Sequence, residues 1–218
     1  MGTDNLFQKR KAKLKFERKR ASKYGIERIL IVCEGEKTEP YYLTELYQSL
    51  GLTNTDVPVF GSEYGSDPGS ILDYALERYQ RDQGIDWVYC VFDKDSHTTY
   101  DETIGRAKNA KLAAGTNLVL IKSVPCFEYW VLLHFRETTK PYGKEKRSPC
   151  ENLINDLKIV FPDYSKGMRN LHASIGEKTD FAISNAKKTM KEATKSDTDN
   201  PTTEMHLLVE HLRKLAKD

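Results

Sequence analysis

The sequence predicts an α/β protein whose parallel sheet is flanked by helices. Three apolar runs, 29–33, 87–92 and 118–121, are continuous rather than alternating, which is typical of strands buried on both faces of a parallel sheet. A segment with helical periodicity follows each run, and such alternation indicates parallel strands joined by helical crossovers. The chain has 218 residues, of which 39% are apolar and 30% charged, a composition typical of a folded domain.

Four helices are predicted in this region from apolar residues at helical spacing. They cover 38–50, 68–79, 101–114 and 129–135. Thr38 is the expected N-cap of the first helix, and Asp67, followed by proline, is the expected N-cap of the second. Gly51 ends the first helix because glycine readily takes the left-handed conformation that closes helices. A weaker strand is expected at 57–60, and Pro58 favours the sheet edge for it.

The last third of the chain has a helical pattern. Residues 137–150 are polar and predict a loop, after which helices are expected at about 151–160, 178–194 and 201–216. For the last of these, Asn200 is the expected cap and Pro201 the first residue. We therefore expect three parts, namely a basic N-terminal arm at 1–26, an α/β core at 27–136, and a mostly helical C-terminal part packed on that core at 137–218.

The cysteine pattern and the hydropathy favour a cytoplasmic protein with no membrane partner. The four cysteines are Cys33, Cys90, Cys126 and Cys150, and they form no CxxC pair of the kind typical of zinc sites. We expect reduced, mostly buried thiols. No apolar run approaches the roughly 20 residues of a membrane span. The basic N-terminus also lacks the apolar stretch of a secretion signal.

A net charge of +2 hides a strongly basic N-terminal segment. Residues 1–28 contain ten Lys/Arg and three acids, whereas the rest of the chain has 24 basic and 29 acidic residues. Such an arm favours nucleic-acid phosphates through counterion release, and the alternative is a solvated tail. The candidate phosphate contacts in the arm are Lys9, Arg10, Lys11, Arg18, Lys19 and Arg20.

Carboxylates follow three of the predicted strands. Glu34 and Glu36 follow the first, Asp93 and Asp95 the second, and Glu128 the third. Ligands of parallel α/β sheets bind at the carboxyl ends of the strands. Side chains two residues apart on a strand point the same way, so the two aspartates repel each other unless a cation or a proton lies between them. Mg²⁺ prefers such carboxylates together with water and phosphate oxygens. The alternative is that these acids are ordinary turn residues.

Two further side chains near these acids suit phosphate binding. Lys37 can hold a phosphate as a point charge, and the alternative is an exposed loop lysine. His97 follows the aspartates and can donate to a phosphate or orient a water; the alternative is a loop histidine without such a role. His134 lies on a very apolar helix, and we expect it to be a packed core residue.

The first predicted strand is followed by Glu34 and Gly35, and the second by Asp93 and Asp95. This arrangement resembles the Toprim core of nucleotidyl transferases and nucleases. More closely, the chain resembles the RloB family. The matching segments are ILIVCEGEKTEPYY at 29–42, VFDKDSH at 91–97, SVPCFEYWVLLHF at 123–135 and NPTT at 200–203. Together they span residues 28 to about 212. The resemblance implies a Toprim-like sheet and a role in prokaryotic antiviral defence, because the family occurs beside restriction-modification genes and in abortive-infection settings.

The same resemblance implies roles for the acids. Glu34 matches a glutamate that acts in general acid–base work or holds a metal, and Asp93 and Asp95 match metal-binding aspartates. Glu36 and Glu128 are then supporting ligands. The implied activity is hydrolysis of phosphodiester bonds by a nuclease dependent on Mg²⁺ or Mn²⁺. Two alternatives stay open: a non-catalytic sensor or adaptor that binds a metal, a nucleotide or nucleic acid, and a nucleotidyl transferase.

The expected partner is DNA or RNA. The basic arm and a loop with Lys144, Lys146 and Arg147 are the expected backbone contacts. No GxxxxGK[ST] phosphate loop occurs in the sequence, so an ATPase or other defence-system partner would be a separate chain. Whether the protein forms a homodimer is left open, as are the type of nucleic acid, the trigger and the number of metal ions.

Overall fold

The computed structural model describes residues 27–217, apart from 55, 62–64, 66, 83, 95–98 and 145. These residues form a five-stranded sheet with the order β2-β1-β3-β4-β5. The first four strands are parallel, and β5 runs antiparallel to β4. The predicted α/β class is confirmed, as is the edge position of the strand after Pro58. The strands are β1 (Ile29–Cys33), β2 (Val59–Phe60), β3 (Trp87–Asp93), β4 (Asn117–Val124) and β5 (Thr202–Thr203).

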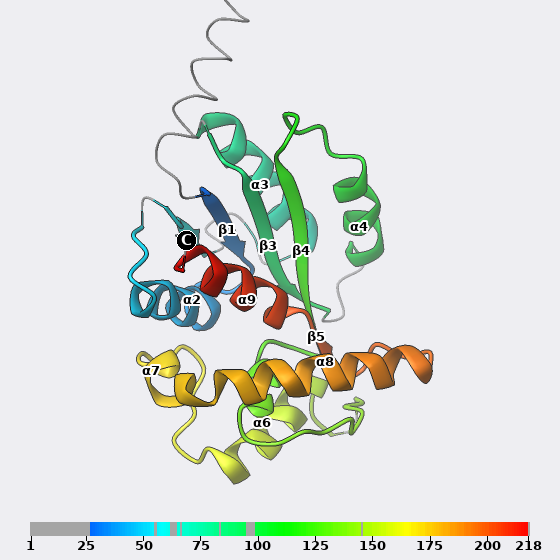
Figure 1. Ribbon diagram of the computed structural model, residues 1–218. Coiled ribbons are helices and arrows are strands. Elements are labelled where there is room, and N and C mark those ends of the chain that lie inside the picture. Colours follow the sequence, from blue (N-terminus) through cyan, green and yellow to red (C-terminus); the bar gives the residue numbers. More distant parts are fainter. Residues whose placement is uncertain are drawn as a thin grey trace, which may run out of the picture.

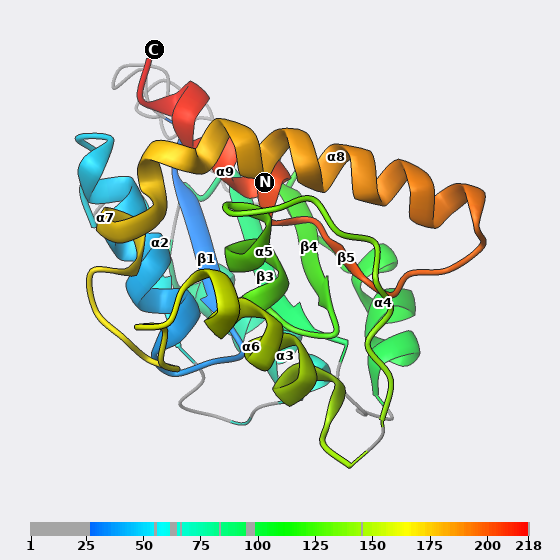
Figure 2. The same cartoon turned by 90° about the horizontal axis from the view of Figure 1, so that it is seen from below.

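Helices cover both faces of the sheet and the carboxyl ends of its parallel strands. In Figure 1, α3 and α4 lie on one face and α2 and α9 on the other, while α6, α7 and α8 form a layer beyond the strand ends. Figure 2 shows α8 running across this layer, with α6 beside α5. The helices are α2 (Thr38–Ser49), α3 (Pro68–Arg81), α4 (Tyr100–Lys108), α5 (Glu128–Leu133), α6 (Pro149–Val160), α7 (Leu171–Ile175), α8 (Thr179–Lys195) and α9 (Met205–Leu215).

The continuous apolar runs reflect two hydrophobic cores, one on each face of the sheet. In β1, Ile29 and Ile31 face the larger core, which also contains residues of α2, α5 and α9. Leu30 and Val32 face the smaller core, which contains residues of α3. Successive strand side chains alternate between faces, so a strand covered on both faces has to be apolar at every position. All five residues of β1 are fully buried.

The predicted caps of the first two helices had different outcomes. Asp67 accepts hydrogen bonds from the backbone N–H groups of Gly69 and Ser70, which confirms it as the N-cap of α3. The prediction for Thr38 was wrong, because this residue is the first of α2 rather than its cap. Its hydroxyl instead accepts a hydrogen bond from the backbone N–H of Gly167 at 2.9 Å, so it holds a distant loop.

The prediction of a helix beginning at Pro201 was also wrong. The Asn200–Pro201 peptide bond is cis, Thr202 and Thr203 form β5, and α9 begins only at Met205. Pairing with β4 satisfies backbone groups along the edge of the sheet, and the hydroxyls of Ser123 and Thr203 lie 3.0 Å apart in this pairing. The C-terminal part therefore supplies one strand of the sheet, besides the helices that were expected. No helix among the described residues is long and apolar enough to cross a membrane.

Candidate acidic site at the carboxyl ends of the strands

The ends of β1 and β3 bring two of the predicted acids together. Cys33 pairs with Val91 in the parallel ladder, so Glu34 follows β1 beside the end of β3. A carboxylate oxygen of Glu34 accepts a hydrogen bond from the backbone N–H of Asp93 at 2.8 Å. Glu34 and Asp93 are both half-buried. The expectation that acids after separate strands meet at one sheet edge therefore holds for this pair.

Glu39 is an additional acid that sequence reasoning missed. It lies in the first turn of α2, only 8% exposed, and its carboxylate packs against Gly35 so closely that a Cβ at position 35 would collide with it. Burial raises the pKa of Glu39 to about 7; its own backbone N–H and Lys166 oppose this shift, and the charges of Glu128 and Glu34 add to it. A glutamate on the apolar face of a helix was the only signal in the sequence.

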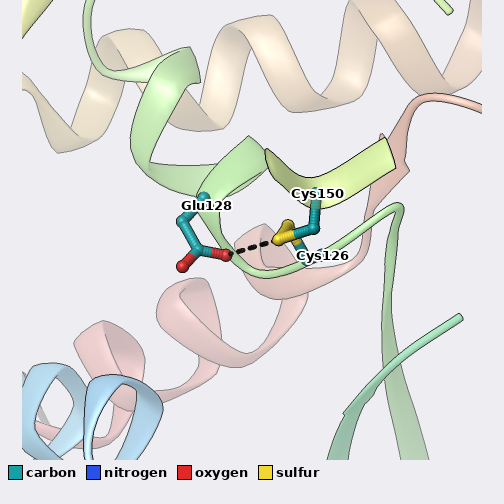
Figure 3. Close-up of side chains that lie close together, drawn as sticks. All are labelled: Cys126, Glu128 and Cys150. Atoms are coloured by element: carbon teal, nitrogen blue, oxygen red, sulfur yellow. Dashed lines mark hydrogen bonds between the residues drawn. A yellow bond between two sulfur atoms is a disulfide. The ribbon is translucent and has the colours of Figure 1, made fainter. Parts of the chain in front are cut away.

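Glu128 begins α5 and is almost fully buried, with 3% exposure. One of its carboxylate oxygens, Oε1, accepts a hydrogen bond from the hydroxyl of Tyr164 at 2.8 Å and lies 3.7 Å from the ammonium of Lys166. The other oxygen, Oε2, lies 3.4 Å from the Sγ atom of Cys150 (Figure 3). The predicted supporting acid is thus held by two residues, Tyr164 and Lys166, that sequence reasoning did not identify.

Cys150 forms a disulfide with Cys126, so the expectation of four reduced thiols was wrong for this pair. It was confirmed for Cys33 and Cys90, which are free and buried in β1 and β3. The two bonded cysteines are 24 residues apart, and only the packing of α6 against α5 brings them together. A disulfide sulfur carries no hydrogen, so the contact with Glu128 in Figure 3 becomes a hydrogen bond only when Cys150 is a thiol.

The charges of four acids, Glu34, Glu39, Asp93 and Glu128, act on one another. Burial, followed by the negative charges of Glu39, Glu128 and Glu34, raises the pKa of Asp93 well above its usual range. Lys166 acts in the opposite direction on this pKa. Crowded carboxylates of this kind are stabilised by uptake of a proton or by a cation placed between them.

Tyr164 and Lys166 come from the connection between α6 and α7. This segment, 161–170, is bound to α2: besides the contact of Gly167 with Thr38, the carboxylate of Glu45 accepts hydrogen bonds from the backbone N–H groups of Asn170 and His172. Sequence reasoning could not find the two residues, because they lie more than 120 positions after Glu39 along the chain. Tertiary contacts alone bring them to the strand ends.

The remaining predicted site residues lie away from this centre or outside the described residues. Asp95, His97 and the basic residues of the arm, from Lys9 to Arg20, fall outside the described residues. Glu36 and Lys37 are exposed in the turn after β1. The exposed loop before α6 contains Lys144, Lys146 and Arg147.

The expectation for His134 is confirmed. The residue is fully buried, its Nδ1 lies 2.9 Å from the backbone oxygen of Trp130, and burial lowers its pKa to about 4. It is therefore a neutral core residue at ordinary pH.

The donor set suits a hard divalent cation. Carboxylate oxygens are the protein ligands that Mg²⁺ and Mn²⁺ prefer. Among the described residues, however, the group of side chains whose ligand atoms lie within 4.8 Å of one another consists of Cys126, Glu128 and Cys150, and its two sulfurs are bonded to each other. In the part of the chain that the structure describes, no three acids form a group of this kind. The acids thus suit a divalent cation by the chemistry of their oxygens and by their mutual repulsion, but their arrangement in the structure does not by itself form a metal site. Asp95 lies outside the described residues.

Fold and site define an α/β protein with a cluster of acids at the carboxyl edge of a mainly parallel sheet. The model of a family described as RloB-like protein matches residues 29–212. The chain belongs to this family. Comparisons with curated proteins and with solved structures found no match.

Proposed function

We propose that the protein is a nuclease dependent on Mg²⁺ or Mn²⁺ that hydrolyses phosphodiester bonds of DNA or RNA in prokaryotic antiviral defence. The observation that carries this proposal is the acid cluster, in which burial and mutual repulsion raise the pKa values of Glu39 and Asp93. Such a cluster attracts a divalent cation, which neutralises the repulsion between the carboxylates as a bound proton does. The defence role and the cytoplasmic location are proposed from family membership, and the contact with nucleic acid from the basic composition of the arm.

In this proposal Glu34, Asp93 and Glu128 hold the cation, together with Asp95 and, from the turn after β1, Glu36. A bound divalent ion supplies Lewis-acid polarisation of a phosphate oxygen and acidification of a bound water. Glu128 is aligned for this role by the hydrogen bond from Tyr164, which restricts its rotation.

Two residues of the chain are proposed to act on the substrate. Lys166 is 62% exposed in its side chain although its ammonium lies near Glu128, so it can reach a phosphate in solution while it offsets the charge of the acids. Glu39 has a pKa of about 7, which suits a group that takes up and releases a proton near neutral pH. Lys37, Arg147 and the basic arm are proposed to contact the nucleic-acid backbone further from the acids.

Cleavage assays test the proposal directly. Purified protein is incubated with supercoiled plasmid, single-stranded DNA and total tRNA in the presence of Mg²⁺, Mn²⁺ or EDTA. The variant Asp93→Asn is compared with Asp73→Asn, which changes an exposed aspartate of α3, on the opposite face of the sheet. We expect cleavage that depends on the metal, is lost in Asp93→Asn and is kept in Asp73→Asn. Binding of Mn²⁺ by a folded protein that cuts none of these substrates would favour the sensor or adaptor module instead.

A further inference from the structure

A disulfide lies directly against one of the proposed cation-binding carboxylates. Cys126 precedes Glu128 by two residues and is 3% exposed, whereas Cys150, the second residue of α6, is half-buried. The Sγ atom of Cys150 is 3.4 Å from Oε2 of Glu128, and Figure 3 shows the two side chains pointing toward each other. The carboxylate of Glu128 therefore contacts this sulfur whether it is part of a disulfide or of a thiol.

The two forms of the sulfur act differently on Glu128. A disulfide sulfur has no hydrogen to donate, so Oε2 faces an acceptor-like atom, while Oε1 already accepts from Tyr164. A thiol at Cys150 has an S–H group within hydrogen-bonding reach of Oε2. Reduction thus places a donor against Oε2, the oxygen that the Tyr164 hydroxyl leaves free, so the S–H group and a cation compete for the same oxygen.

The disulfide also connects elements that shape the site. It joins the segment entering α5 to the first turn of α6, and α6 leads directly into the connection with Tyr164 and Lys166. Opening the bond removes the crosslink between two positions that are 24 residues apart, and the segment between them includes exposed positions before Ser148. Reduction therefore gives more conformational freedom to the segments that precede α5 and α6, the first of which leads into Glu128.

We propose that Cys126 and Cys150 form a reversible redox site that controls the affinity of Glu128, and with it of the acid cluster, for a divalent cation. A dithiol is the reductant: its thiolate attacks Sγ of Cys150, the sulfur–sulfur bond breaks, and Cys126 leaves as a thiolate that takes up a proton. The second thiol of the reductant then displaces Cys150, so that two thiols form on the protein and one disulfide on the reductant. A small disulfide such as oxidised glutathione reverses the reaction.

The two other cysteines do not interfere with this exchange. Cys33 and Cys90 are fully buried in β1 and β3, and burial raises the pKa of Cys90 to about 12 and that of Cys33 well above its usual range. Thiol–disulfide exchange needs an accessible thiolate, which neither residue supplies. The exchange is thus restricted to one pair, and Cys150 is the more exposed member.

The inference rests on the proposed function for the role of Glu128, but its test does not need nuclease activity. The full chain is prepared with dithiothreitol or with oxidised glutathione, and thiols are counted after denaturation. We expect four thiols in the reduced form and two in the oxidised form, since the sequence has four cysteines and two are free in the structure. Titration calorimetry with Mn²⁺ should show tighter binding by the oxidised form, by a factor of about 2–10, the effect of one hydrogen bond. The oxidised form should also melt several degrees higher.

Two single variants separate the hydrogen bond from the crosslink, since neither can form the disulfide. Cys126→Ala keeps the Cys150 thiol, so we expect it to bind Mn²⁺ as weakly as the reduced wild type. Cys150→Ala has no sulfur beside Glu128, so we expect it to bind Mn²⁺ more tightly than Cys126→Ala, although both variants lack the crosslink. Both should be unaffected by dithiothreitol, whereas Cys90→Ala should respond as the wild type does.

Three outcomes would overturn the redox site. They are equal Mn²⁺ affinity in all forms, a disulfide that dithiothreitol opens only in denaturant, and tight one-to-one binding of Zn²⁺ by the reduced protein, which would assign the pair to a thiolate metal site. If no nucleic acid is cut while the thiol count and the Mn²⁺ affinity change as described, the redox site stands and the nuclease proposal fails. If cleavage occurs and is identical in both forms, the nuclease proposal stands and the redox control fails.

Discussion

The carboxylate of Glu34 accepts a hydrogen bond from the backbone N–H of Asp93, with 2.8 Å between the two atoms. This contact connects the end of β1 to the end of β3. It also fixes the carboxylate of Glu34 relative to the backbone of Asp93. Because the acceptor is a side chain and the donor is backbone, substitution of the Asp93 side chain leaves this hydrogen bond in place. The two strand ends can therefore stay joined while one charge of the cluster is removed.

Asp93→Asn is expected to remove cation binding without unfolding the protein. The raised pKa of Asp93 means that its ionised form is unfavourable in the folded state, and asparagine avoids this charge at a similar size. Thermal unfolding at pH 8 should show a midpoint equal to or a few degrees above that of the wild type without metal. Mn²⁺ should stabilise the wild type and Asp73→Asn, but not Asp93→Asn. A midpoint well below that of the wild type would show that the aspartate is mainly structural.

The stability of the metal-free protein is expected to fall as the pH rises from about 4.5 to about 7. The pKa of Glu39 is about 7 in the folded state and 4.5 as its ordinary value, so between these values the folded state binds more protons than the unfolded state. The contribution of Glu39 is fully present below pH 4.5 and is lost by about pH 7, a change of about 3 kcal/mol. Urea unfolding across this range measures it. Glu39→Gln should flatten the profile; an unchanged slope in this variant would contradict the assignment.

Tyr164→Phe is expected to weaken both stability and cation binding. The substitution removes the hydroxyl that donates to buried Glu128, which costs about 1–3 kcal/mol in the free energy of unfolding. Tyr142→Phe is the matched control, because Tyr142 is also buried and donates to a carboxylate, that of Asp156. Both variants should lose stability in urea unfolding, but only Tyr164→Phe should lower the Mn²⁺ affinity in calorimetry. Equal Mn²⁺ affinity in the two variants would remove Tyr164 from the site.

Glu45→Ala is expected to loosen the connection that carries Tyr164 and Lys166. The carboxylate of Glu45 accepts two backbone hydrogen bonds at the start of α7, and their loss should cost about 1–2 kcal/mol. Hydrogen exchange should become faster at residues 161–172. The control is Glu77→Ala, which removes an exposed ion pair with Arg81 on α3 and should cost less than about 1 kcal/mol. Unchanged exchange in Glu45→Ala would show that other contacts hold the segment.

The sheet could be predicted well because its signals are local. The run of β1 is apolar at every position since both faces are covered, and Asp67 with Pro68 makes a cap from adjacent residues. The end of the chain could not be predicted in this way. Asn200 and Pro201 suit a helix start by composition, but the edge of β4 pairs with Thr202 and Thr203, and this long-range pairing prevails over local preference.

The residues of the candidate site also fall into two groups, those that local sequence signals predict and those that only long-range packing brings to the site. The acids that follow strands were found because parallel strands end at one edge, so Glu34 and Asp93 had to meet. Glu39, Tyr164 and Lys166 were not found, since their place near the acids depends on how α2 packs and on a loop that begins 160 residues into the chain.

The sequence by itself determined the α/β class, the family, and the acids at the strand ends, because periodicity and short motifs are properties of neighbouring residues. Only the tertiary structure decided that Cys126 and Cys150 are bonded beside Glu128, and that a tyrosine and a lysine from the α6–α7 connection contact the same carboxylate. Such contacts join segments 24 and more residues apart, and they arise from the packing of whole elements, which no local pattern of residues specifies.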